Sequence, residues 1–122
     1  MDLLFVEAAP FTAERDDYLP PEQFREVQNA LIAEPRKGDV VPDTGGIRKL
    51  RVPDASRGKG KRGGCRLFYM YLPEVSEIHF LAIYSKNEKV DLTASDKKAM
   101  RRIVDEIRTT ALLRDTLRKK GQ

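Results

Sequence analysis

Two apolar runs separated by five residues constrain the fold of this chain more than any other feature. RLFYMYL occupies residues 66–72 and IHFLAIY occupies residues 78–84. Both runs are rich in the aromatic and branched residues that strands favour. The segment between them, PEVSE, is short enough for a hairpin. We therefore expect these two runs to form neighbouring strands.

The other elements follow from shorter patterns. Pro21 suits the first turn of a helix, and the residue before Pro35 avoids the helical region. Residues 93–96, TASD, resemble an N-cap with an acid at the third helical position. In chain order we expect a strand at 3–6, helices at 11–19 and from 21 to before 35, strands at 47–52, 66–72 and 78–84, and a C-terminal helix after 93. This order predicts one α+β domain over residues 1–122, with a small antiparallel sheet packed by N-terminal helices and a C-terminal helix.

Residues 47–52, IRKLRV, alternate apolar and basic side chains, as a half-buried strand does. One face of the strand would present Ile47, Lys49 and Arg51, and the other would present Arg48, Leu50 and Val52. Its three basic residues form either the solvated side of a strand or part of a binding surface.

Positive charge is concentrated in one short window. Residues 1–47 contain four Lys/Arg and ten Asp/Glu, a net of −6, whereas residues 48–66 contain eight and one, a net of +7. Residues 67–122 contain eleven and eight, a net of +3. A basic window beside an acidic half is typical of a surface that binds a polyanion.

The stretch RGKGKRGGCR, residues 57–66, is the densest part of that window. It holds Arg57, Lys59, Lys61, Arg62 and Arg66 among four glycines, and no acid. Like charges at this spacing repel, and glycines add chain entropy that folding must overcome. The stretch is either a solvated face or a loop on which something negative lies. It lacks the G-x-x-x-x-G-K-[ST] order of a P-loop.

Composition argues against a metal site, a Ser-His-Asp hydrolase and a secreted or membrane-spanning protein. Cys65 and His79 are the only cysteine and the only histidine, so a zinc site would need carboxylates at positions that no spacing suggests. The position of His79 in the middle of the strand IHFLAIY argues against a Ser-His-Asp site. We expect His79 to pack within or at the edge of the sheet, and we expect no metal or cofactor. A lone cysteine fits a reducing cytoplasm, the start lacks a basic signal region, and no apolar run approaches the ~20 residues of a membrane span.

Lysine and arginine can replace histidine in RNA cleavage. A lysine crowded by other cations loses its proton more easily, so Lys59 or Lys61 could act as the base. Arg66 suits a clamp on the phosphate in the transition state. The segment IYSKNEKVDLT, residues 83–93, adds Tyr84, Lys86 and Lys89 beyond the last strand. Tyr84 would either contact the RNA, by stacking on a base or by donating to a phosphate, or pack in the core. The two lysines either belong to the same site or are ordinary turn residues.

Three segments, in order, resemble the RelE/HigB toxins of bacterial type II toxin–antitoxin modules: DTGGIRKLR, GKGKRGGCRLFYMY and IYSKNEKVDLT. The resemblance implies a microbial-ribonuclease-like fold and an endonuclease that cuts mRNA in the ribosomal A site, halting translation. We accordingly predict catalytic roles for Lys59, Lys61, Arg66, Tyr84 and Lys86, and RNA binding by Arg48, Lys49, Arg51, Arg57, Arg62 and Lys89.

The resemblance also implies partners. These are the ribosome and mRNA, a cognate antitoxin that is often a helix-turn-helix protein, and operator DNA reached only through that antitoxin. Two alternatives remain, an RNA- or ribosome-binding module without cleavage and an antitoxin-pairing corepressor. Whether Tyr69 faces the RNA or the core depends on strand register.

Overall fold

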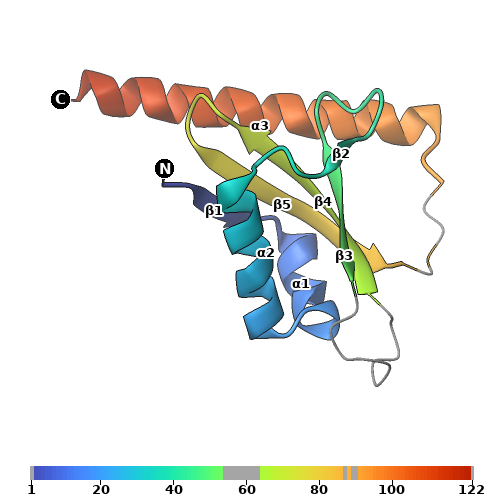
Figure 1. Cartoon of the computed structure of the whole chain (residues 1–122). Coiled ribbons are helices and arrows are strands. Elements are labelled where there is room, and N and C mark those ends of the chain that lie inside the picture. Colours follow the sequence, from blue (N-terminus) through green and yellow to red (C-terminus); the bar gives the residue numbers. More distant parts are fainter. Residues whose placement is uncertain (1, 54–63, 87, 89–90, 122) are drawn as a thin grey trace.

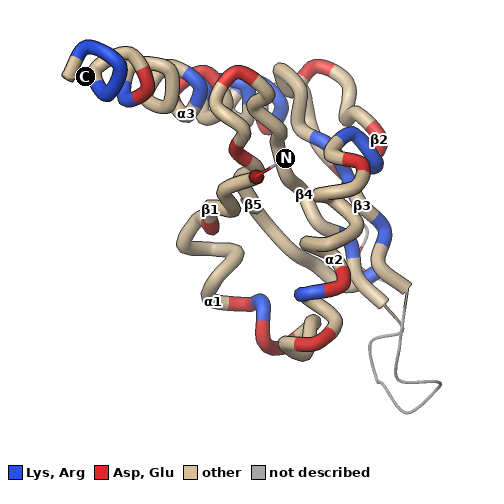
Figure 2. Tube along the Cα trace, turned by 60° about the vertical axis from the view of Figure 1, so that its left-hand side comes forward, with Lys and Arg blue, Asp and Glu red and all other residues tan. Residues whose placement is uncertain are grey.

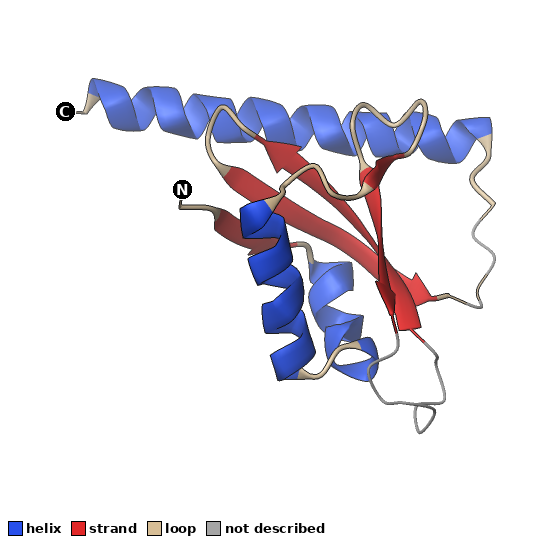
Figure 3. Ribbon diagram, in the orientation of Figure 1, coloured by secondary structure: helices blue, strands red, loops and turns tan. Residues whose placement is uncertain are grey.

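The computed structural model describes residues 2–53, 64–86, 88 and 91–121. Its elements are β1 (Leu4–Glu7), α1 (Ala9–Tyr18), α2 (Pro21–Ala33), β2 (Asp39–Val40), β3 (Arg48–Pro53), β4 (Gly64–Leu72), β5 (Glu77–Ser85) and α3 (Ala94–Lys120). In this part of the chain α1 and α2 lie on one face of a five-stranded sheet and α3 runs across the other (Figures 1 and 3). The predicted α+β class is confirmed, with its N-terminal helices and its C-terminal helix.

The strand order is β1-β5-β4-β3-β2. The predicted hairpin is confirmed, because β4 and β5 are antiparallel, and β3 pairs antiparallel with β4 on the other side. Two details differ from prediction. The edge strand β1 runs parallel to β5, so the sheet is mixed, and the two-residue strand β2 pairs with β3. A two-residue strand is too short for alternation to reveal, and strand patterns do not specify pairing direction.

Each face of the sheet has its own apolar core. The core under α1 and α2 contains Phe11, Leu19, Phe24, Val27, Leu31, Leu50, Val52, Cys65, Leu67, Tyr69, Ile78, Phe80 and Ile83. The core under α3 contains Ile47, Phe68, Met70, Leu72, Val104 and Ala111. Strand β3 contributes Leu50 and Val52 to the first core and follows Ile47 of the second, as its alternation predicts. Burial on both faces holds the sheet between two helical layers.

A bulge in β5 decides which side chains reach each face. Phe68 and Tyr69 are consecutive in β4, yet their partners are Ala82 and Phe80, which leaves Leu81 without a partner. An extra residue shifts the alternation of everything after it. As a result Phe80 and Ile83 both lie in the core under α1 and α2, and Tyr84 lies on the α3 side.

The start of α3 is fixed by the predicted cap. Thr93 Oγ1 accepts a hydrogen bond from Asp96 N at 3.0 Å, and Asp96 Oδ2 accepts one from Thr93 N at 3.0 Å. This reciprocal capping box satisfies two backbone donors at the helix start. No helix in the described ranges combines the length and the apolar character needed to cross a bilayer.

Candidate nucleic-acid interface

One row of side chains crosses β3, β4 and β5 at the end of the sheet farthest from the turn between β4 and β5. Arg66 of β4 is the register partner of Arg51 in β3 and of Tyr84 in β5. Directly opposed residues of neighbouring strands point to the same face. That face is the α3 side, because Tyr84 packs there against Phe68 with ring centroids 5.2 Å apart. The register therefore brings two of the predicted arginines and the predicted tyrosine together.

The two arginines of this row, Arg51 and Arg66, place like charges directly opposite each other. Arg66 donates from a terminal guanidinium nitrogen to the backbone oxygen of Cys65 at 3.2 Å. Among the residues that the structure describes, neither Arg51 nor Arg66 forms an ion pair with a carboxylate. Blue segments follow β3 and the start of β4 in Figure 2, whereas α1 is mostly red where it is charged. Like charges directly opposed on a sheet are destabilising, so an anion bound here would relieve their repulsion.

Tyr84 is a hydrogen-bond donor at neutral pH. Burial raises the pKa of its phenol above the ordinary value of 10.0, with the Arg66 guanidinium opposing the rise and the Glu88 carboxylate adding to it. The hydroxyl therefore remains protonated at neutral pH. Its half-buried ring leaves one end at the surface, where the phenol can contact a phosphate or a base.

Lys86 lies where β4 begins and β5 ends. Its backbone N–H donates to Gly64 O at 3.3 Å, and its side chain is exposed. The turn that carries it is fixed by Glu88, whose Oε1 accepts from Ser85 N at 3.0 Å and from Tyr18 Oη at 3.1 Å. Lys86 is thus close in the fold to the start of the strand that carries Arg66.

A cleft of about 280 Å³ adjoins the row. Phe68 and Tyr84 line it from the sheet, Val41 and Leu92 line it from two connecting segments, and Lys49, Asp91 and Lys97 contribute charges. Lys49 was predicted to bind RNA. Asp91 and Lys97 were not predicted, because they come from the segment before α3 and from its first turn, and nothing in the sequence places these near β3.

Several predicted residues lie outside this grouping. Five of them, Arg57, Lys59, Lys61, Arg62 and Lys89, fall outside the described residues.

Arg48 is described but lies on the other face of the sheet. It alternates with Lys49 and faces the α1 and α2 side, where its guanidinium donates to Arg36 O at 3.1 Å and to Gly38 O at 2.8 Å. These bonds hold the segment after α2 against β3, which gives Arg48 a structural task.

Tyr69 faces the core. Its side chain is fully buried, donates to Pro35 O at 2.8 Å and accepts from Gly38 N at 2.9 Å. Gly38 is needed there, because a Cβ at this position would approach the Tyr69 ring to 2.8 Å. The register thus assigns Tyr69 to packing and leaves Tyr84 as the tyrosine of the interface.

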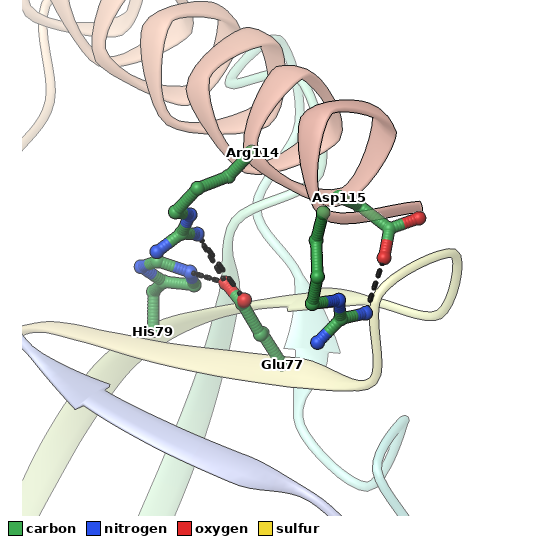
Figure 4. Close-up of polar contacts among 5 residues, drawn as sticks. Glu77, His79, Arg114 and Asp115 are labelled. Carbon is green, nitrogen blue, oxygen red and sulfur yellow. Dashed lines mark hydrogen bonds and ion pairs between the residues drawn. The ribbon is translucent and has the colours of Figure 1, made fainter. Parts of the chain in front are cut away.

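His79 packs in the sheet, as expected, and belongs to a polar cluster at the far end of β5. Its Nε2 lies 2.8 Å from Glu77 Oε1, and Arg114 of α3 donates to both Glu77 oxygens at 3.3 and 3.2 Å (Figure 4). Glu77 and His79 are 7% and 8% exposed. The spacing Glu-x-His on one strand is a signal that sequence reasoning could have used, whereas Arg114 has no such signal. No group of three or more metal-ligating residues occurs within the described ranges.

No protein-family model matches the chain. Among solved structures, the chain is similar to an arginine-to-alanine mutant of the E. coli toxin RelE in the free state, with 13% identity and a TM-score of 0.49. The match covers 83% of this chain and 95% of that one. At this identity and TM-score, no activity or partner of that protein is carried over to this chain.

Proposed function

We propose that this chain is an endoribonuclease toxin that cuts mRNA on the ribosome, inhibits translation and is neutralised by a cognate antitoxin. The observation that carries the proposal is the row formed by Arg51, Arg66 and Tyr84 beside the cleft. Its two arginines have no carboxylate partner among the residues that the structure describes. Positive charge that is left uncompensated on a sheet suits a phosphodiester backbone. The sequence resemblance to RelE/HigB toxins supplies the ribosomal context.

The proposed reaction uses the RNA's own 2′-hydroxyl. Its oxygen attacks the adjacent phosphorus and its proton passes to a base, for which Lys59 and Lys61 remain the predicted candidates. A bond forms between O2′ and phosphorus, and the bond from phosphorus to O5′ breaks. The products are a 2′,3′-cyclic phosphate and a 5′-hydroxyl, whose oxygen receives a proton from an acid. We assign this step to Lys86, which was predicted to be catalytic without a specified role.

Arg66 and Tyr84 would act on the charge that develops during this step. The phosphorane carries more negative charge on its oxygens than the starting diester, and a guanidinium can hold two of them through parallel N–H donors. A donor placed where charge develops contributes about 10²–10³-fold to rate. The protonated phenol of Tyr84 adds a neutral donor beside it.

Mapping of RNA 5′ ends after induction tests this function. The chain is expressed in bacteria without an antitoxin, together with one reporter message in two forms, with and without a start codon. We expect growth arrest and new 5′-hydroxyl ends in codon register that appear only in the translated form. Unchanged growth and intact translated messages under verified expression would refute the proposal. RNA that copurifies with the chain without new ends would identify a binding module instead.

A further inference from the structure

We propose that the cleft beside the row binds one nucleobase of the RNA and that Asp91 makes it selective for guanine. This inference rests on the proposed function, because it assigns the RNA a second contact at the same site. The cleft is distinct from the row, although Tyr84 belongs to both. A base held there would keep its own phosphate near the row.

The size and lining of the cleft suit one planar group. Sites for drug-sized ligands have volumes of about 300–1,000 Å³, and this cleft has about 280 Å³. The half-buried ring of Tyr84 provides aromatic surface above Phe68, which is itself 8% exposed, and Val41 and Leu92 line the sides of the cleft. Single-stranded RNA is commonly recognised by bases that are splayed out and stacked against aromatic side chains.

The walls are held in place by contacts of their own. Val41 donates its N–H to Ile47 O at 2.8 Å and accepts from Thr44 Oγ1 at 2.8 Å. Thr44 is fully buried and also accepts from Ile47 N at 3.1 Å. On the other side, the capping box of Thr93 fixes the residues next to Leu92. A site formed before the ligand arrives loses less freedom on binding.

The charges in the cleft are not paired with one another. Within the described part of the chain, Lys49, Asp91 and Lys97 form no ion pair, although all three line the same space. The two lysines suit the phosphate groups on either side of a bound base. A carboxylate does not suit phosphate, because the two anions repel. Asp91 is therefore the feature of this cleft that phosphate binding leaves unexplained.

A carboxylate beside a stacked base accepts hydrogen bonds from N–H groups on the edge of that base. Guanine presents two adjacent donors on its Watson–Crick edge, N1–H and N2–H, which match the two oxygens of a carboxylate. Cytosine, adenine and uracil each present one donor group there. A good bidentate pair discriminates between bases by about 1–3 kcal/mol, or five- to 150-fold. The carboxylate thus points to guanine as the preferred base.

The test is an NMR titration of the ¹⁵N-labelled full chain with the four 5′-nucleoside monophosphates. We expect GMP to bind about tenfold more tightly than AMP, CMP or UMP and to shift the amides of Lys49, Phe68 and Leu92. The Asp91→Asn variant should bind all four within about twofold. Asp105→Asn removes the same charge from an exposed position on α3 and should keep the preference of the wild-type chain. A wild-type chain without a preference, or one whose preference survives Asp91→Asn, would overturn the inference.

Mapping of 5′ ends separates this inference from the proposed function. If the wild-type chain cuts beside guanine and Asp91→Asn cuts without a base preference, both are supported. If cutting persists with the same preference in Asp91→Asn, the guanine site is refuted and the nuclease stands. If no cuts occur but GMP binds selectively, the nuclease is refuted and the guanine site stands.

Discussion

At the start of β5, the carboxylate of Glu77 is buried and accepts hydrogen bonds from Arg114 and His79. At the other end of β5, Tyr84 lies opposite Arg66, which lies opposite Arg51, and neither arginine has an acid partner among the described residues. Both ends place charge against the same sheet. At the start of β5 the acid and its partners satisfy one another. At the other end the two arginines face each other as like charges. The difference indicates that the first end serves folding and that the second is arranged for a ligand.

The largest expected effect is the loss of activity in Arg66→Ala. We expect mRNA cleavage to fall at least 100-fold, because the donor that would stabilise the phosphorane is removed. Folding stability should stay within about 0.5 kcal/mol or rise, because the repulsion with Arg51 is relieved. Quantified 5′ ends and thermal unfolding measure the two effects. Arg25→Ala, an exposed arginine on α2, is the matched control, and a fully active Arg66→Ala would contradict the assignment.

At the start of β5 we expect the opposite result, a large loss of stability with little effect on cleavage. Glu77→Ala leaves His79 buried without its acceptor and removes the partner of Arg114, so we expect a loss of about 2 kcal/mol of stability. This corresponds to a melting temperature lower by about 5–10 °C, with cleavage retained well below that temperature. Glu74→Ala changes the same residue type at an exposed turn position and should have little effect. A melting temperature equal to that of the wild-type chain would show that the cluster does not stabilise the fold.

Arg48 and Lys49 are neighbours on β3 whose side chains lie on opposite faces of the sheet, so they test the same comparison within one strand. Arg48→Ala removes the donor to Arg36 O and Gly38 O and should cost about 1 kcal/mol of stability. Lys49→Ala should instead weaken RNA binding and lower the slope of log affinity against log salt by about 0.7, the value for one phosphate contact on a single strand. Urea unfolding and binding at several salt concentrations distinguish the two. If both substitutions change the salt slope equally, the two faces of β3 do not differ in function.

The smallest expected effect concerns pH and the start of α3. Hydrogen bonds from Thr93 lower the pKa of Asp96 below its ordinary value of 3.8. The charged carboxylate therefore contributes stability that is fully present above pH 3.8 and is lost as the pH falls through the lowered pKa. Asp96→Asn should have a lower free energy of unfolding than the wild-type chain near neutral pH, and this difference should become smaller in acid. Urea unfolding at several pH values measures the difference, with the exposed Asp17→Asn as control. A difference that does not change with pH would contradict this account.

Local patterns predicted much of the fold. The alternation in 47–52 gave the correct faces of β3, the spacing after Thr93 gave the cap of α3, and the linker at 73–77 gave the hairpin. Each of these features is determined by residues close together in the chain. The parallel partner of β1 and the two-residue strand β2 depend on contacts between distant segments, which such patterns do not contain.

The candidate site was predictable to a similar extent. The predicted pairing of residues 66–72 with residues 78–84 places the end of the second strand near Arg66, and the structure pairs Tyr84 with Arg66. The bulge at Leu81, which makes Tyr84 rather than Ile83 the partner, could not be predicted from the strand pattern. Asp91 and Lys97 reach the cleft only because α3 crosses the sheet, so their role depends on tertiary packing. The separation of Arg48 from Lys49 followed from the alternation of β3, but the backbone oxygens that occupy Arg48 could not be foreseen.

The unpaired Leu81 in β5 carries a consequence for how such a surface can evolve. Its deletion would place Phe80 and Ala82 next to each other opposite Tyr69 and Phe68, so simple alternation would return. Tyr84 would still lie opposite Arg66, and Ile83 would stay on the opposite face of the sheet. This edge of the sheet can therefore lose one codon at the bulge and keep its chemistry.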